Sequence, residues 1–325
     1  MSHLNRRAML GALAVAPWMA PYSRAQGNWP SRTIRLVVPY PAGGAPDIFT
    51  RTLGEQLAIG LKAIVIVDAK PGASGLLGMR AVSQGPADGH TFAYTSSGQV
   101  TLTAMNPKFD LLKELKPVVR LSASPFVLLV RADSPYKTVR DLVKAVQAQP
   151  GQLSYGTAGP GSPAHMAVAY LEEAIKDFNA LHVPFKGAVE SINAMLGGQI
   201  VFTIAVLGAA APHIKGGKLR ALGVTPAKRV ALFPDVPTIA EATGTDYAYE
   251  SWGGFTVHAD TPDEVIAQAA KAFVTAAQSD SVGKYLANTG GRLALMPSPA
   301  EFGKALAREV ELERRVVKRL GITQS

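Results

Sequence analysis

The stretch TIRLVVPYPAGGAPD, residues 33–47, decides the fold class of this chain. Its first part, TIRLVVP at 33–39, is an almost continuous apolar run, which predicts a strand buried on both faces. A glycine-rich turn follows, and apolar residues then recur at helical spacing up to Leu57. A buried strand that leads through a tight turn into a helix indicates an α/β fold with a parallel sheet.

The same alternation continues along the chain and begins a second time near residue 127. We expect strands of the first series at 64–67, 89–95 and 126–130, and of the second at 153–156, 180–184, 201–206 and 219–224. The extended run YESWGGFTV at 249–257 can return to the first series, and helical patterns at 262–277, 281–289 and 299–320 close the chain. Two lobes are therefore predicted: residues 26–126 begin the first, 127–253 form the second, and 254–325 complete the first.

The first 25 residues have the pattern of an export signal. Arg6 and Arg7 precede a short apolar run, and small residues end the segment near Ala25, where we expect cleavage. The run is too short for a transmembrane anchor and contains Pro17. The paired arginines suggest the twin-arginine route, with the general secretory route left open. We therefore expect the mature chain in the periplasm.

Composition excludes several classes of protein. Of the 325 residues, 47% are hydrophobic and only 18% are charged, which excludes a disordered chain or a coiled coil. The absence of cysteine excludes disulfides, thiolate nucleophiles and iron–sulfur clusters. The formal charge is +9, but three of the arginines lie in the export signal, and acids interleave with the basic stretch at 308–319. We expect no nucleic-acid partner.

The turn after the first strand is a candidate anion site. Gly43 and Gly44 let the backbone turn and present its N–H groups at a helix N-terminus, and Pro46 suits the first helical position. Asp47 then lies in the first turn, where the helix dipole favours its charge. A tight turn with a purely structural role is the alternative. The candidate ligand-binding residues of this turn are Tyr40, Ala42, Gly43, Gly44 and Asp47.

A second turn of the same kind follows about 115 residues later in the sequence. The stretch GTAGPGSP at 156–163 ends a strand and opens a helix, with Ser162 as the N-cap. If the two lobes face each other, the two turns can hold a dicarboxylate or an amino acid between them. The candidate residues here are Ala158, Gly159, Gly161, Ser162 and His165, although His165 could equally form a structural hydrogen bond.

Two further turns lie at the same predicted sheet edges. Ser96 and Ser97 follow the strand at 89–95, where open α/β sheets place their ligand crevices. Lys186 and Gly187 follow the strand at 180–184 and are candidates to line the site, with an ordinary surface lysine as the alternative.

Most enzymatic motifs are absent from the sequence. It has no GxSxG elbow, no phosphate loop and no HExxH pair, and its histidines show no metal-ligand spacing. One weak match is kept as an alternative function, an exported NADP-type enzyme that uses Gly159, Gly161 and Ala164 as a dinucleotide fingerprint. The acid that normally follows about 20 residues later is missing, and Lys186 stands there. We therefore expect no cofactor, no metal and no catalysis.

These features together resemble the Bug family, the extracytoplasmic solute receptors of tripartite tricarboxylate transporters. The resemblance extends from Trp29 to Ile322 and rests on ordered blocks, among them WPSRTIRLVVPYPAGGAPD, PGQLSYGTAGPGSPAHMA and HVPFKGAVESINAMLGGQI. It implies a two-lobed, type II periplasmic-binding-protein fold with two hinge crossings. It also implies a carboxylate ligand held at 40–47 and 158–165, largely through backbone N–H groups and waters, and transporter membrane components as partners. We expect a monomer.

Two departures from that family bear on the ligand. Where the family often reads GGQVD, this chain has GGQIV at 197–201, so the acid is absent, and Ala45 and Pro46 stand where a Gly-Thr pair is common. The far half of the ligand is therefore expected to be more apolar. The ligand stays open among aliphatic dicarboxylates, tricarboxylates, aromatic acids and amino acids.

Overall fold

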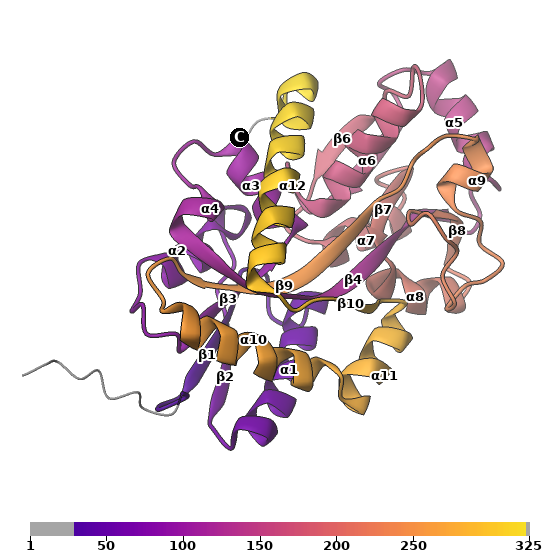
Figure 1. Ribbon diagram of the computed structural model, residues 1–325. Helices are drawn as coiled ribbons and strands as arrows, with labels where there is room; N and C mark the ends of the chain where they lie inside the picture. The colour runs from indigo at the N-terminus through magenta and orange to yellow at the C-terminus, as the bar shows by residue number, and fades with distance from the viewer. Residues whose placement is uncertain (1–28, 323–325) are drawn as a thin grey trace, which may run out of the picture.

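A computed structural model describes residues 29–322 of the chain (Figure 1). The predicted export signal lies outside the described residues. Within them, no helix combines the length and the apolar character needed to cross a membrane. The strands form two connected sheets with helices on both faces, which confirms the predicted two-lobed α/β fold.

The first sheet combines strands from both ends of the chain. Parallel pairs join β1 to β2 and β3, whereas β9 runs antiparallel between β3 and β4, and β10 pairs with the outer side of β4. Its strands, in spatial order, are β2 (Val65–Ala69), β1 (Ile34–Val38), β3 (Thr91–Ser96), β9 (Glu250–His258), β4 (Leu115–Arg131) and β10 (Arg292–Met296).

The second sheet shares β4 with the first. β4 pairs with β9 up to Pro125, and from Phe126 onward it lies between β7 and β8. Proline cannot donate a ladder hydrogen bond, and Pro125 stands where the strand changes partners. The order is β8 (Leu219–Val224), β4, β7 (Phe202–Val206), β5 (Ser154–Thr157) and β6 (Leu181–Pro184). The lobe boundaries within this arrangement remain predictions.

Helices cover both faces of each sheet. Around the first sheet lie α1 (Ala45–Leu61), α2 (Leu76–Ser83), α3 (Ser97–Met105), α4 (Leu111–Glu114), α10 (Asp263–Ala277) and α11 (Asp280–Thr289). Around the second lie α5 (Val139–Ala148), α6 (Pro163–Ala174), α7 (Ala188–Leu196), α8 (Leu207–Lys215) and α9 (Ile239–Thr243). Stacked and edge-on aromatic rings, including Phe92, Phe255 and Phe273, fill the core between the first sheet and its helices α1 and α10.

The C-terminal helix α12 (Pro299–Leu320) packs against both halves of the molecule. Its first turns place Phe302 and Val310 in a core cluster of the first sheet, together with Trp252. Farther along, Val316 belongs to the main core cluster of the second sheet. In Figure 1 the helix stands beside α3 and extends toward α6. Helix α12 therefore contributes side chains to the cores on both sheets.

Several elements differ from the sequence-based expectation. The first half of β4, the strand β10 and the helices α2, α3, α4 and α8 were not predicted, and β4 pairs with β7, β8, β9 and β10 in antiparallel rather than parallel orientation. Lys116, Pro117 and Arg120 interrupt the apolar pattern of β4, and Pro212 lies inside α8. These residues break the periodic pattern of β4 and α8, so periodicity indicates neither the first half of β4 nor α8.

Candidate functional site

The first turn joins β1 to α1 and is fixed by a buried acid. Asp47 is only 2% exposed, accepts the Gly43 N–H at 2.9 Å and accepts two hydrogen bonds from Arg51, each at 3.0 Å. Burial alone would raise the pKa of Asp47, but the bonds from Arg51 and Gly43 outweigh it and lower that pKa. Asp47 therefore points back into the turn. The N-cap residue Gly44 provides no side-chain cap to the first N–H groups of α1.

Tyr40 connects this turn to the end of β3. Its hydroxyl lies 2.7 Å from Ser96 Oγ and accepts a hydrogen bond from Gln99 Nε2 at 3.2 Å. Ser96 and Gln99 also form a capping box at the start of α3. Ser97 Oγ lies 2.7 Å from Ser251 Oγ, which joins α3 to the return strand β9. These side chains hold β1, α3 and β9 in one fixed arrangement.

The second turn joins β5 to α6 and is built around His165. The Gly161 N–H donates to His165 Nδ1 at 3.0 Å, and Ser162 Oγ accepts the His165 N–H at 3.3 Å. The ring stacks on His182 with centroids 4.1 Å apart, and His182 Nε2 lies 2.6 Å from Thr157 Oγ1. Burial, and then the neighbouring His182, lower the pKa of His165 to about 4. His165 is therefore neutral at pH 7, with its proton on Nε2.

The glycine N–H groups of both turns are hydrogen-bonded within the protein, which contradicts the expectation that they are free to bind a ligand. Gly43 donates to Asp47, Gly44 to the Pro41 carbonyl, Gly159 to Thr157 Oγ1 and Gly161 to His165. Gly43, Gly159 and Gly161 adopt φ values of 78°, 98° and 70°, which favour glycine. These glycines therefore shape the turns, and the donors open to a ligand must be other groups.

The remaining candidate ligand-binding residues lie at the edges of the two turns or just before α7. Ala42 and Lys186 are exposed, and the Lys186 N–H donates to Glu190 at 3.1 Å. Gly187 is the N-cap of α7, which has no side-chain cap, and the half-buried Ala158 lies between Thr157 and Gly159.

The two turns meet at the start of α3. A Cβ built on Gly98 would lie 2.8 Å from the Tyr40 hydroxyl and 3.4 Å from Pro163 Cδ, so residues of both turns flank this glycine. A Cβ on Gly161 would overlap Met105 Sδ at the other end of α3. Helix α3, which covers the first sheet, therefore packs directly against the β5–α6 turn of the second sheet.

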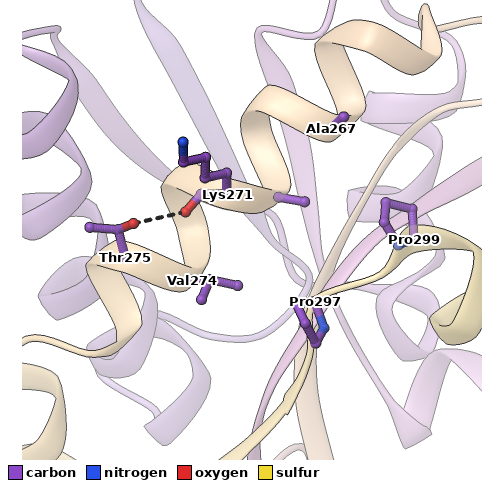
Figure 2. A pocket seen from close by; sticks show the side chains of 7 residues that line it. Ala267, Lys271, Val274, Thr275, Pro297 and Pro299 are labelled. Atoms are coloured by element: carbon purple, nitrogen blue, oxygen red, sulfur yellow. Dashed lines mark hydrogen bonds between the residues drawn. The ribbon is translucent and has the colours of Figure 1, made fainter.

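Two shallow surface hollows lie elsewhere. Figure 2 shows one of about 340 Å³ between α10 and the segment from β10 to α12, lined by Ala267, Lys271, Val274 and neighbouring residues. A second, of about 310 Å³, lies among Arg32, Arg35, Lys70 and Thr91. Neither hollow contains a residue of the two turns, so the candidate site is defined by the turns themselves.

The sequence-based reading missed the residues that support the turns. Arg51, Gln99, Thr157 and His182 hold the candidate residues through the bonds above. For two of them the sequence contains a local pattern. Gln99 stands three residues after Ser96, the spacing of a capping box, and Arg51 stands four residues after Asp47, the spacing of a helical ion pair. The stacking of His182 on His165 depends on the pairing of β5 with β6 and has no local signal.

Residues 49–322 match the model of the family described as "Tripartite tricarboxylate transporter family receptor". A protein of Pseudomonas sp. (strain P51), named for the tcbD-tcbE intergenic region, is 34% identical over 271 residues, which are 82% of this chain and 80% of that protein. Protein BugT of Bordetella pertussis is 28% identical over 314 residues, 95% of each chain.

Three solved structures share the fold over almost their whole length. Periplasmic binding protein BugD has a TM-score of 0.82 at 25% identity, and the alignment covers 91% of this chain and 100% of BugD. An R. palustris protein with adipate has a TM-score of 0.83 at 28% identity, with 91% and 99% coverage. MatC from Rhodopseudomonas palustris, with bound malate, has a TM-score of 0.80 at 26% identity, with 89% and 99% coverage.

Proposed function

The chain belongs to the tripartite tricarboxylate transporter receptor family, and from this premise we propose that it captures a small dicarboxylate between its β1–α1 and β5–α6 turns. Its relatives are periplasmic solute-binding receptors, so the chain is a binding protein and not an enzyme. The alternative of an NADP-type enzyme at Gly159, Gly161 and Ala164 is therefore rejected.

The observation that carries this proposal is the meeting of the two turns at Gly98. A ligand that bridges Tyr40 and the start of α6 would contact both sheets at once. The first N–H groups of α1, which lack a side-chain cap, suit one carboxylate. The donor on His165 Nε2 suits the other. Adipate and malate in the two solved relatives are dicarboxylates of this kind.

Delivery and location complete the proposal. The receptor passes its ligand to the membrane components of a tripartite transporter. Residues 1–25 direct its export to the periplasm, with cleavage after about Ala25, and the mature receptor acts as a monomer.

A binding screen on the receptor purified from the periplasm tests this function. Malate, adipate, succinate and citrate, each in excess, should raise the melting temperature when they bind, because a ligand at 100 times its Kd adds about 2.7 kcal/mol of stability. NADP is the comparison compound and should leave the melting temperature unchanged. A shift with NADP and none with any carboxylate would overturn the proposal.

A further inference from the structure

Glu313 is a buried acid at the junction of the two halves of the molecule. It lies on α12 between Val310, which packs with the first sheet, and Val316, which packs with the second. The residue is only 3% exposed. Acids are rarely buried to this extent unless they are paired, and none of the ion pairs among residues 29–322 includes Glu313.

Two hydroxyl groups from opposite halves donate to this carboxylate. Tyr170 of α6 donates to Oε1 at 3.2 Å. The Thr101 hydroxyl of α3 lies 3.3 Å from Oε2, and it shares its single proton between this carboxylate and the Ser97 carbonyl, which is 3.2 Å away. Helix α12 packs along α3 over much of its length, whereas it meets the second half near its C-terminal end, through Val316 in the core cluster and an ion pair of Arg319 with Glu173 of α6. A separation of the two sheets would therefore break the bond of Glu313 to Tyr170 and admit water.

Within residues 29–322, no cation is in hydrogen-bonding contact with Glu313. Glu309, one turn earlier on α12, accepts the Trp252 Nε1–H at 2.8 and 2.9 Å and adds a second negative charge. Tyr249, ahead of β9, faces both acids with a buried hydroxyl. Arg120 of β4 faces Glu309 and lies 5.7 Å from the Trp252 ring centroid. The charge of Arg120 therefore acts mainly on Glu309.

We propose that Glu313 is a positioning residue that latches α6 to α3 and α12 when the two halves close, and that this closure takes up a proton. The inference rests on the proposed function, since closure matters only to a receptor that encloses its ligand. The latch comprises Glu313, Tyr170 and Thr101.

The direction of the effect follows from the two environments of the carboxyl group. In the latch, burial and then Glu309 raise the pKa of Glu313 to about 7, and the bonds from Tyr170 and Thr101 only partly oppose them. In an opened junction, water restores a pKa near the ordinary value of 4.5. The closed form therefore holds the proton more tightly. Lowering the pH from about 8 to about 6 should favour closure by roughly tenfold.

The test measures the Kd of malate and adipate by calorimetry at pH 6 and pH 8, where both are largely dianions. The native protein should bind about tenfold more tightly at pH 6. Glu313→Gln should bind almost equally at both pH values and more tightly than the native protein at pH 8. If Glu313→Gln keeps the native pH dependence, or if the native protein shows none, the latch is wrong.

Two further variants separate this latch from a merely structural acid. Glu309→Gln removes the neighbouring charge and should move the midpoint of the pH profile downward. Tyr170→Phe removes a donor that favours the carboxylate and should move the midpoint upward, and it serves if Glu313→Gln fails to fold. Midpoints that do not move in these opposite directions would contradict the proposal.

If neither malate nor adipate binds, the proposed ligand class fails independently of the latch. The radius of gyration of the ligand-free protein, measured by small-angle scattering at pH 6 and pH 8, then decides. The native protein should be more compact at pH 6, whereas Glu313→Gln should have the same radius at both. An unchanged native radius would overturn the latch.

Discussion

Asp47 and Glu313 are both nearly fully buried acids, yet their surroundings shift their pKa values in opposite directions. Arg51 and the Gly43 N–H stabilise the charge of Asp47, so its pKa lies below the ordinary value. Glu313 has only hydroxyl donors and a second acid nearby, so its pKa is raised. The first acid stabilises a turn at neutral pH, and the second is poised to change its charge near pH 7.

Asp47→Asn should destabilise the fold at pH 7. The variant loses charge-assisted bonds to Arg51 and Gly43, a loss of about 1.5–3 kcal/mol in the free energy of unfolding. Because the folded-state pKa is lowered, this stability is present above the ordinary pKa and is lost as the pH falls through the folded-state value. Urea unfolding at pH 7 and pH 3 measures it, with the exposed Asp246→Asn as control. An equal deficit at both pH values would contradict this account.

Glu313→Gln should have the reverse pH dependence. A carboxyl group whose folded-state pKa is raised to about 7 contributes stability that is full below its ordinary pKa and lost as the pH rises through 7. The glutamine variant should therefore be more stable than the native chain by about 3 kcal/mol at pH 8, with little difference at pH 4. Chemical unfolding of both proteins at the two pH values decides. A destabilised variant at pH 8 would show that the carboxylate is preferred.

Helix α3 is the element that brings the two turns together. Its residues Ser97–Thr103 are all buried although four of the seven are serine, threonine or glutamine. Helix α3 lies between the sheets and pairs its polar groups with Tyr40, Ser251 and Glu313. A polar helix buried at a junction is therefore a sign that its partners come from elsewhere in the chain.

Gly161→Ala tests the contact between α3 and the second turn. The added Cβ overlaps Met105 and also meets a positive φ, so we expect a loss of about 2–3 kcal/mol in stability. Gly43→Ala, whose Cβ would meet nothing within 4 Å, should cost only about 1 kcal/mol for its backbone strain. Met105→Ala should recover part of the Gly161→Ala loss in a double-mutant cycle. Strict additivity of the two changes would place Met105 elsewhere.

Local signals in the sequence predicted the elements that flank both turns but not the junction. Buried strands and the N-cap Ser162 are consequences of short-range chemistry and lie as expected, whereas Pro46 is the second residue of α1 rather than the first. The pairing of β9 with β3 and β4 joins residues far apart in the sequence. The contacts of Gly98 and Glu313 depend on that pairing, so no local pattern could predict them.

For the whole molecule, two sheets joined by β4 allow a ligand to draw the halves together. A dicarboxylate that bridges the two turns should reduce the radius of gyration, and its monoester should not, because one set of charge-assisted bonds is lost. Small-angle scattering with adipate and monomethyl adipate measures the difference. Equal compaction by both compounds would show that one turn alone holds the ligand.

The position of β9 in the first sheet also governs the order in which the molecule can be assembled. All strands of the second sheet lie within residues 115–224, whereas the slot between β3 and β4 is filled only by residues 250–258. A growing chain can therefore complete the second sheet while β3 and the first half of β4 still lack their partners β9 and β10. Unpaired edges are prone to association, so we expect nascent receptor to need a holding chaperone until its last third has been synthesised.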